Sequence, residues 1–515
     1  MTSISEYAIV VGPNDNVAVV KKETFVDLEV LLPNGALVKL RDVVQPGHRF
    51  ATRDIPAGEF VTQFGQPIGT SLGIQSGEQI THANMSNDVP LIRDLPDSLH
   101  TPPPDYFPEA ERRTFMGFRR GDGRVGTRNY VLIVPTSMCA SHEASQISMI
   151  AEFTLYNRDK YKNVDGVVAI PHNKGCGCQD GSTIEVMLRT LSNYADHPNV
   201  GGVILIDLGC EKTNLSQVEK YLLKREKSFD KPVAKIGIQE AGGTQAAIQQ
   251  GLKDVEQMLP EVNRTAREEC SVSEIVLGVK CGGSDGFSGI SANPSLGRAA
   301  DLLVRSGGTV LITEVPEFCG AEHLLACRAK DVETGREVYR MVDWYKEYAS
   351  KFGAVLAQNP SPGNITGGLL NITIKSLGAI AKAGTTRVEG VLEYAESWKT
   401  RGLNLMQGPG YDQESTPGLV AAGATVVVFT TGRGTTIGNA IAPVIKLASN
   451  TPIFERMKND LDLSAGGVID GTETIDEVGR RVFDHVIEVA SGLEAKAETH
   501  KHREFQFWAE QTVSL

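Results

Sequence analysis

The sequence predicts a multidomain α/β protein, in which a small N-terminal all-β module precedes two α/β domains with mainly parallel sheets. The chain has 515 residues, which is too long for one hydrophobic core. Residues 1–92 contain short apolar runs separated by the turn sequences PND, PNG and PAG, a pattern typical of antiparallel strands. From residue 115 apolar strands alternate with helical stretches, which indicates βαβ units.

Changes in composition predict where these regions begin and end. Residues 93–114 carry three consecutive prolines and many charges, so we expect an extended linker there. A polar stretch at residues 255–272 separates the two α/β domains, which we expect at residues 115–265 and 266–515. The polar tail after residue 492 is expected to reach a neighbouring element or subunit. Apolar periodicity in the last domain predicts strands at 275–280, 309–314, 387–393 and 424–430 and helices at 296–306, 336–350 and 474–491.

The composition excludes several classes of protein. The net charge of −12 and the lack of a dense basic run argue against a nucleic-acid surface. No apolar stretch approaches the roughly 18–20 residues that a membrane span needs. The N-terminus lacks a charged-then-apolar signal pattern, so we expect a cytoplasmic protein. Its eight cysteines should then be thiols that serve packing, metal binding or chemistry.

Four predicted strands end in loops that contain cysteine beside glycine or serine. These loops read PTSMCASHE, PHNKGCGCQDG, LGCEKTN and CGGSDGFSG, and their first or central thiols are Cys139, Cys176, Cys210 and Cys281. Open α/β sheets place their active sites at the carboxyl ends of strands, so these loops could meet at one site. Glycine beside cysteine allows a ligand to approach closely. The loop of Cys139 has no adjacent glycine, so we expect that thiol only to pack.

The loop HNKGCGCQDG combines His172, Lys174 and Cys176 within five residues. Histidine and cysteine together suit a soft or borderline metal. His172 or Lys174 could equally act as a general base. A helix N-terminus with a merely buried cysteine is the alternative.

Arginine clusters and glycine loops predict sites for an anionic substrate. Arg124 and Arg128 lie in GFRRGDGRVGTRN, where their guanidinium groups could bind a carboxylate or could simply pair with acidic groups of the protein. Backbone amides of glycine- and serine-rich loops also bind anions. The candidates in such loops are Ser284 and Asp285 in CGGSDGFSG and Arg433, Thr435 and Thr436 in FTTGRGTTIGN, with a capped turn as the alternative for the second loop. Lys280, before the first loop, is a further catalytic candidate.

Nucleotide-binding signatures are missing from the sequence. It contains neither GxxxxGK[ST] nor a GxGxxG after a first strand, which disfavours nucleoside triphosphates and dinucleotide cofactors. In the N-terminal module, His48 and His82 lie in adjacent predicted turns and could reach the neighbouring site.

The elimination of water from a hydroxy acid fits these candidates: thiols, histidines, arginines and anion-binding loops, with no nucleotide-binding motif. Such a reaction removes a weakly acidic proton beside a carboxylate, and a metal can polarise the carboxylate or the leaving hydroxyl. Ferrous iron fits the mixed ligand inventory. We expect a single iron ion in preference to a cluster held by three cysteines with one open iron, or to another divalent metal.

Seven motifs together closely resemble the altronate/galactarate dehydratase family. They are PGHRFATRDIPAGEFVTQFGQPIG, GFRRGDGRVGTRN, HNKGCGC, LGCEK, CGGSDGFSGISANPSLG, NPSPGN and FTTGRGTTIGNAIAPVIKLASN, and the resemblance covers residues 8–492. It implies an N-terminal β-clip module of the SAF type, two α/β domains, and loss of water from a sugar acid to give a 2-keto-3-deoxy acid. It also implies stimulation by ferrous iron.

The resemblance implies functional residues as well. His48, His172, Cys176, Cys210 and Cys281 match the loops of the family, and the THAN sequence that contains His82 is similar to the altronate branch. The segment GPGYDQES at 408–415 also looks like that branch. We therefore expect D-altronate as substrate, a homo-oligomer as the assembly, and a metal site drawn from His48, His82, Cys176, Cys210 and Cys281. The alternatives are a galactarate dehydratase, a carbon–sulfur lyase acting on sulfolactate, and a non-catalytic sugar-acid binding protein.

Overall fold

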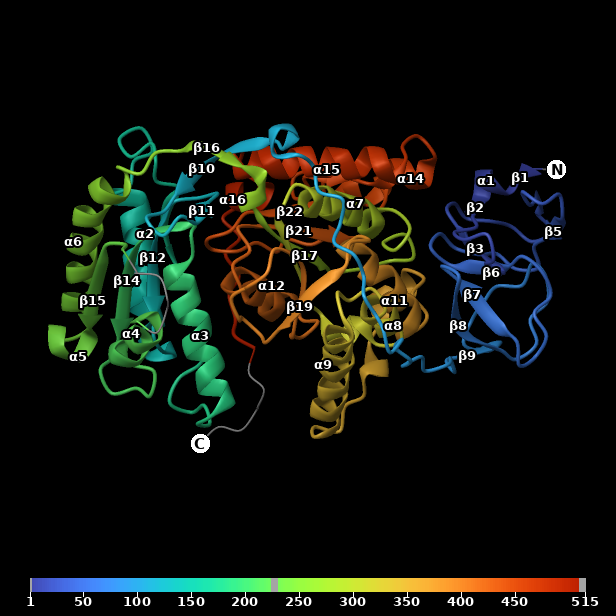
Figure 1. Ribbon diagram of the computed structural model, residues 1–515, viewed down its shortest axis with the longest axis horizontal. Coiled ribbons are helices and arrows are strands. Elements are labelled where there is room, and N and C mark those ends of the chain that lie inside the picture. The colour runs from blue at the N-terminus through green and yellow to red at the C-terminus, as the bar shows by residue number, and fades with distance from the viewer. Residues whose placement is uncertain (1, 224–229, 509–515) are drawn as a thin grey trace.

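A computed structural model of the chain describes residues 2–223 and 230–508. Three regions lie in a row: the N-terminal module at one end, the C-terminal α/β domain in the middle and the second α/β domain at the other end (Figure 1). The chain therefore crosses the C-terminal domain before it forms the second domain, and later returns to the middle. No helix of the described residues is long and apolar enough to span a membrane.

The N-terminal module is almost entirely β-structure, as predicted. It consists of three small sheets with the strand orders β1-β4-β5, β2-β3-β6 and β7-β8-β9. The elements are β1 (Thr2–Ser3), α1 (Ile4–Tyr7), β2 (Ala8–Ile9), β3 (Val17–Val20), β4 (Glu29–Leu31), β5 (Leu37–Lys39), β6 (Arg49–Ala51), β7 (Phe60–Gln63), β8 (Gln66–Ser71) and β9 (Met85–Ser86). Strand β3 is buried along its whole length, so it forms the centre of the module.

The proline-rich segment is extended and lies along the C-terminal domain. Leu95 and Leu99 pack against the core of that domain, and the backbone N–H of Phe107 donates to the carbonyl of Arg305 at 2.8 Å. The segment ends where β10 (Thr114–Arg119) pairs with β11 (Val125–Gly126) and β16 (Glu268–Ser271) in an antiparallel sheet. This small sheet joins the entry and the exit of the second domain.

The second domain contains a parallel sheet of order β13-β12-β14-β15 with helices on both faces. Alternate residues of β12 point to opposite faces, with Val131 and Ile133 on one side and Leu132 and Val134 on the other. The face that carries Leu132 and Val134 packs against residues of the C-terminal domain and forms one continuous core with them. The elements are β12 (Tyr130–Pro135), α2 (Ser141–Thr154), β13 (Gly166–Ala169), α3 (Ser182–Asp196), β14 (Val200–Asp207), α4 (Leu215–Leu223), β15 (Val233–Gly237), α5 (Ile238–Ala241) and α6 (Thr244–Val262).

The C-terminal domain contains a wholly parallel sheet of order β19-β20-β18-β17-β21-β22-β23. The predicted strands and helices of this domain are confirmed, and the strands β20, β22 and β23 are additional. The strands are β17 (Val276–Cys281), β18 (Thr309–Ile312), β19 (Val388–Leu392), β20 (Gly402–Met406), β21 (Val426–Thr431), β22 (Val444–Ala448) and β23 (Leu463–Ser464). The helices are α7 (Ala292–Arg305), α8 (Glu322–Ala326), α9 (Val332–Ser350), α10 (Pro362–Thr366), α11 (Ile372–Ile380), α12 (Asp412–Ala421), α13 (Thr451–Arg456), α14 (Gly466–Asp470), α15 (Ile475–Ala490) and α16 (Lys496–Thr499).

Each α/β domain contains a point at which the order of its strands reverses. In the second domain the chain goes from β12 to β13 and then returns to β14 on the other side of β12. In the C-terminal domain it goes from β17 to β18 and later places β21 on the other side of β17. Ligands bind outside the carboxyl ends of the strands at such points. The fold therefore offers two candidate locations for a site.

Candidate active site

Three exposed thiols lie on the loops that follow neighbouring strands of the second domain. Cys139 follows β12, Cys176 follows β13 and Cys210 follows β14, and all three are exposed free thiols. The loops of Cys139 and Cys210 flank the point where the strand order reverses. We call the loops 136–140, 171–181 and 208–214 the thiol edge. Cys139 was expected only to pack, whereas the structure exposes it beside the other two loops.

The thiol edge is held together by bonds between its loops. The backbone N–H of Met138 donates to the carbonyl of Lys174 at 2.6 Å. The ammonium of Lys212 donates to the carbonyl of Cys178 at 3.2 Å and pairs with Asp180 at 3.0 Å. The loop of Cys176 thus connects the other two loops.

A buried carboxylate fixes the geometry of two of these loops. Glu211 accepts hydrogen bonds from the backbone N–H groups of Leu208 and Gly209 at 2.9 and 2.7 Å, and from the hydroxyls of Thr136 and Ser137 at 2.9 and 3.0 Å. Burial would raise the pKa of Glu211, but these donors hold it below its usual value. The carboxylate is therefore occupied within the loops, where it positions them.

His172 is engaged on both sides of its ring. Nε2 donates to the carbonyl of Pro135 at 3.0 Å, and Nδ1 accepts from the backbone N–H of Lys174 at 3.3 Å. The ring also packs edge-on against Phe507 with centroids 4.6 Å apart. Burial lowers the pKa of His172 to about 4. These bonds fix one neutral tautomer, so the geometry gives His172 a positioning role in place of the predicted one as base.

Glu414, a residue not selected from the sequence, faces the thiol edge from the C-terminal domain. It lies in the first turn of α12, and the amide of Gln506 donates to its Oε1 at 3.3 Å. Burial raises the pKa of Glu414 to about 7, and the nearby ammonium of Lys174 opposes part of that rise. Its proton affinity suits a group that exchanges protons near neutral pH. The segment GPGYDQES, which resembles the altronate branch of the family, contains Glu414 and could have drawn attention to it from the sequence.

The C-terminal tail passes between the two α/β domains. Phe505 contacts Tyr194 of the second domain with ring centroids 4.9 Å apart, and Trp508 stacks on Tyr345 of the C-terminal domain at 5.9 Å. The prediction that the tail reaches neighbouring elements is confirmed for its described residues.

At the carboxyl ends of β17 and β18 the C-terminal domain contains a closed network of lysines and carboxylates, which we call the buried charge cluster. Its members are Lys280, Glu314, Glu317, Lys375, Lys382, Asp412 and the thiol of Cys281. Lys280 pairs with Glu314, both fully buried, and with Asp412 at 2.8 Å. Lys382 pairs with Glu314 at 3.0 Å and Lys375 with Glu317 at 2.8 Å. Three ammonium groups thus face three carboxylates.

Cys281 is a neutral member of this cluster. Its Sγ lies 3.3 Å from Oε2 of Glu317 and 3.2 Å from the ammonium of Lys382. Burial raises the pKa of the thiol well above its usual value. For Glu317, burial is outweighed by Lys375, Lys382 and Lys280, which lower its pKa to about 2.

Three side chains of the buried charge cluster lie as close together as the ligands of a metal ion would. One ligand atom each of Cys281, Glu314 and Glu317 lies within 4.8 Å of the others, and no other such group of three occurs in residues 2–223 and 230–508. The charges are already balanced, however, and each carboxylate accepts from a buried ammonium. A metal would have to displace these lysines, so the donor set does not fit one. Of the five predicted ligands only Cys281 lies here, and the structure does not bring His48, His82, Cys176 or Cys210 to it.

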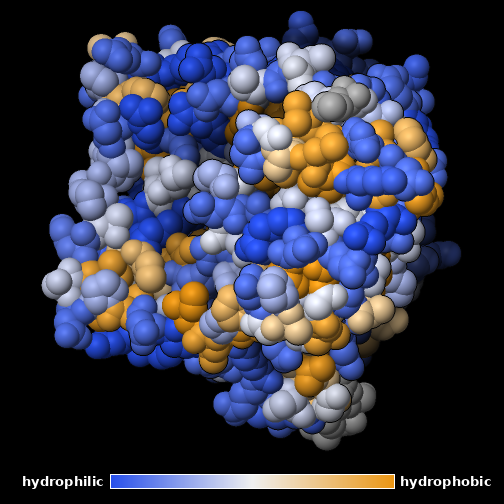
Figure 2. Space-filling model, turned by 90° about the vertical axis from the view of Figure 1, so that its right-hand side faces the viewer, coloured by the Kyte–Doolittle hydropathy of each residue, from blue (hydrophilic) through white to orange (hydrophobic). Residues whose placement is uncertain are grey.

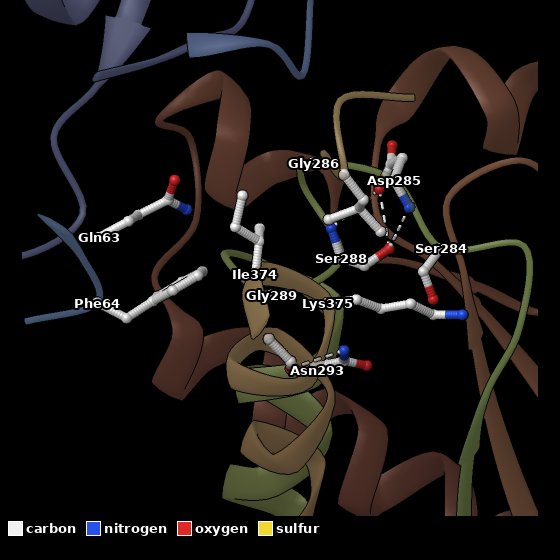
Figure 3. A pocket seen from close by; sticks show the side chains of 12 residues that line it. Gln63, Phe64, Ser284, Asp285, Gly286, Ser288, Gly289, Asn293, Ile374 and Lys375 are labelled. Carbon is white, nitrogen blue, oxygen red and sulfur yellow. Dashed lines mark hydrogen bonds between the residues drawn. The ribbon is translucent and has the colours of Figure 1, made fainter. Parts of the chain in front are cut away.

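The N-terminal module closes the second crevice, that between β17 and β21. Gly47 packs so tightly that an added Cβ would lie 2.6 Å from the carbonyl oxygen of Gly367. His48 donates from Nε2 to the carbonyl of Thr366 at 3.1 Å, and burial lowers its pKa. Figure 3 shows Gln63 and Phe64 of the module facing the 284–289 loop and Lys375 across a small cavity of about 10 Å³, which is room for about one water molecule.

Asp285 has a structural role in this crevice. It accepts from the hydroxyls of Ser288 and Ser449 at 2.8 and 2.9 Å and from the amide of Asn450 at 2.9 Å. Burial raises the pKa of Asp285. The hydroxyl of Ser284 is buried and has no hydrogen-bond partner among the described residues. Ser284 thus keeps a free polar group, whereas Asp285 does not.

The other predicted anion ligands divide into paired and free groups. Arg128 is buried and binds Glu498 through two bonds of 2.7 Å, and Arg124 pairs with Asp122 at 2.5 Å and Asp196 at 3.0 Å. These two arginines hold the structure together, because protein carboxylates already occupy them. The predicted ligands outside such pairs are the exposed Arg433 and Thr436 and the partly exposed Thr435, together with His82 in an exposed turn of the N-terminal module.

Comparison with known proteins matches the whole described architecture. Family models match at residues 6–88 (altronate/galactarate dehydratase SAF domain), 117–263 (D-galactarate dehydratase/altronate hydrolase, second domain) and 272–513 (D-galactarate/altronate dehydratase, C-terminal). The chain is 36% identical to altronate dehydratase of Bacillus subtilis, over 91% of this chain and 92% of that protein. The chain belongs to the altronate/galactarate dehydratase family.

Two further relatives define the range of this family. Galactarate dehydratase (L-threo-forming) of Escherichia coli is 38% identical over 94% of this chain and 93% of its own length. The (2R)-sulfolactate sulfo-lyase subunit beta of Chromohalobacter salexigens is 33% identical over 77% of this chain and 97% of its own length. The three family matches also support the SAF module and the two α/β domains expected from the sequence.

For this member of the dehydratase family, the thiol edge with Glu414 is the better candidate active site. It combines exposed thiols, a proton-exchanging carboxyl group and Lys174, whose ammonium forms no ion pair within the described residues. At the second crevice the N-terminal module packs on the neighbouring loops and the buried lysines and carboxylates are paired, although Arg433 is exposed there. Among the described residues, the thiol edge thus offers exposed thiols and an unpaired ammonium, which the buried charge cluster does not.

Proposed function

We propose that the chain is a hydro-lyase that removes water from D-altronate, or from a closely related aldonate or aldarate, to give a 2-keto-3-deoxy sugar acid. The observation that carries this proposal is that the dehydratase relatives match more than nine-tenths of the chain, including the N-terminal module. The sulfo-lyase subunit matches over 400 residues, about the length of the two α/β domains alone. The segment GPGYDQES favours D-altronate over galactarate.

The reaction requires one proton transfer beside the carboxylate and one departure of hydroxide. A base takes the proton from C2, the C3–O bond breaks, and the hydroxide leaves as water after it gains a proton. The resulting enol then takes a proton at C3 and becomes the 2-keto acid. Glu414 suits the first step, because a carboxyl group with a pKa of about 7 is partly ionised at neutral pH and binds the acquired proton well.

Lys174 suits recognition of the substrate carboxylate. Its ammonium lies on the thiol edge, close enough to Glu414 to affect the pKa of that carboxyl, and has no ion-pair partner among the described residues. An unpaired cation binds a carboxylate without first breaking another pair. Arg433, which the sequence also suggested as a carboxylate ligand, lies at the other crevice, so we assign the recognition of the carboxylate to Lys174 first.

Iron is the cofactor that we propose for the enzyme. The exposed thiols of the thiol edge are soft ligands and fit iron, whereas the buried charge cluster does not. Iron bound there would polarise the carboxylate or the leaving hydroxyl of the substrate. We also infer a cytoplasmic location, because all eight cysteines are free thiols, as is usual in a reducing compartment.

We infer a homo-oligomer from the surface of the N-terminal module. Phe25, Val26, Leu31, Leu37 and Val43 are 39–54% exposed, and Leu31 and Leu37 are partners across β4 and β5. Figure 2 shows hydrophobic side chains gathered on this end of the molecule. Exposed apolar groups of this extent mark association surfaces. Sedimentation velocity should show a species larger than the monomer, and a monomer at micromolar concentration would contradict the inference.

The test of the activity is a substrate panel. Protein purified without oxygen and supplied with ferrous iron is offered D-altronate, galactarate, other aldonates and sulfolactate, and 2-keto acid and sulfite are measured. We expect 2-keto acid from D-altronate at the highest kcat/KM. No 2-keto acid from any sugar acid, or sulfite from sulfolactate as the main product, would overturn the proposal.

A further inference from the structure

We propose that the thiol edge binds an iron–sulfur cluster through Cys139, Cys176 and Cys210, leaving one iron without a protein ligand. The inference deepens the proposed function, because it names the residues that hold the iron and selects a cluster over a single ion. Of the ligand set expected from the sequence it keeps Cys176 and Cys210, adds Cys139, and leaves out Cys281, His48 and His82.

The first argument is position in the fold. Cys139 and Cys210 follow β12 and β14, which are hydrogen-bonded neighbours in the sheet. Adjacent strands lie about 4.8 Å apart, so loops that leave them at the same edge begin close together. These two loops also flank the reversal of strand order, where ligands bind in open α/β sheets.

The second argument is the path of the loop that contains Cys176. The carbonyl of Lys174 binds the backbone N–H of Met138, the neighbour of Cys139, at 2.6 Å. The carbonyl of Cys178 binds the ammonium of Lys212, two residues beyond Cys210, at 3.2 Å. Cys176 lies midway between these two anchors. The loop that contains the third thiol is therefore bound to the loops of both other thiols.

The third argument separates a cluster from a single ion. A tetrahedral ion with metal–sulfur bonds near 2.3 Å brings its thiolates to about 3.8 Å from one another. Among the described residues these three thiols do not form a group within 4.8 Å. In a cluster each thiolate binds a different iron, so the sulfur ligands stand further apart. The ring of His172, the nearest imidazole in the loop, is occupied on both nitrogens and offers no ligand.

The fourth argument is the charge and support of the site. Cysteine thiols lose their protons when they bind iron, and a cluster with three thiolates is anionic. The ammonium of Lys174, two residues before Cys176, favours that charge, whereas the ammonium of Lys212 on the neighbouring loop is paired with Asp180. The carboxylate of Glu211 holds the loops of Cys139 and Cys210 in place through hydrogen bonds from the Ser137 hydroxyl and the Cys210 N–H. The exposed thiols thus sit on a fixed scaffold, as metal ligands require.

Glu414 of the C-terminal domain interacts electrostatically with Lys174 of the thiol edge, so an iron held by the three thiols would have this carboxyl group in its neighbourhood. A site with three protein ligands keeps one position for a water or a substrate oxygen. The proposed base and an iron held by the thiol edge would then act on the same substrate.

The experiment counts iron and sulfide in the full-length protein, without reference to activity. Wild-type protein is reconstituted without oxygen from ferrous iron and inorganic sulfide, and its visible and EPR spectra are recorded. We expect roughly four irons and a similar number of sulfides per chain, with the broad visible absorption of a cluster. Cys139→Ser, Cys176→Ser and Cys210→Ser should each lose most of the iron and that absorption.

Matched variants make the result specific. Cys327→Ser removes an exposed thiol outside the thiol edge, and Cys178→Ser and Cys281→Ser remove the nearest and the buried alternatives. All three should retain the cluster, with folding checked by circular dichroism. Iron bound without sulfide, no iron at all, or loss of iron in C281S with retention in C139S would overturn the inference. A complete cluster in protein that dehydrates no sugar acid would instead contradict only the proposed function.

Discussion

The thiol edge and the buried charge cluster occupy equivalent places in two parallel sheets, yet their residues behave differently. At the thiol edge the thiols are exposed and Lys174 has no ion-pair partner among the described residues. In the buried charge cluster, Lys280 and Glu314 are fully buried and paired. Burial with complete pairing leaves no charge free for a ligand and makes the loss of any one partner costly, whereas access without pairing leaves groups ready for a ligand. The comparison teaches that position alone does not identify the site.

The largest effect should come from Glu414→Gln. Removal of the base should lower kcat by about 10² to 10⁴. In the wild type, kcat/KM should fall as the pH drops below about 7, because burial raises the pKa of Glu414 to that value and the base must be ionised. E414Q should lose that pH dependence, measured by initial rates from pH 5 to 9.

The matched control for this variant is Glu477→Gln. Glu477 occupies the same third position of the first turn, in α15, where it caps the helix at the surface. Its pH–rate profile should equal that of the wild type. An unchanged profile in E414Q would show that Glu414 takes no part in proton transfer.

The second effect concerns stability. Glu314→Gln should destabilise the protein by about 3–5 kcal/mol, because it leaves buried ammonium groups without their partner. Asp180→Asn at the thiol edge removes a carboxylate that is 84% exposed and should cost less than about 0.5 kcal/mol. Urea unfolding measures both values, and equal costs would refute the contrast between the two regions.

The third effect concerns substrate binding. Lys174→Met should raise KM for D-altronate by roughly 10- to 100-fold, the value of a hydrogen bond between charged groups. Arg433→Met should raise it less than about threefold, because Arg433 lies at the other crevice. Steady-state kinetics measure both KM values. A larger rise in KM for R433M than for K174M would indicate that the substrate binds at the C-terminal domain instead.

The smallest effect concerns the contact of the N-terminal module. Gly47 and Gly35 have the same φ of 84°, but an added Cβ meets the carbonyl of Gly367 at 2.6 Å in the first case and nothing within 4 Å in the second. Gly47→Ala should therefore cost about 1–2 kcal/mol more than Gly35→Ala. Thermal unfolding measures the difference, and equal costs would mean that the module tolerates a looser fit.

The sequence predicts the architecture well because strand ends and hydrophobic periodicity are local signals. The same reasoning locates Cys176 and Cys210 at the carboxyl ends of parallel strands. It cannot reveal partners that are distant along the chain: Arg128 binds Glu498 and Cys281 meets Lys382, so neither is the open ligand that its loop suggests. Cys139 was underestimated because exposure depends on how α2 begins, and Glu414 because its proton affinity arises from burial between two domains.

The central claim is that the thiol edge is where the substrate reacts. The most direct measurement is the EPR spectrum of the reconstituted, reduced wild-type protein with and without saturating D-altronate. The account predicts that the substrate changes the signal, because it approaches the open iron. An identical spectrum in a sample that converts D-altronate to 2-keto acid would contradict it.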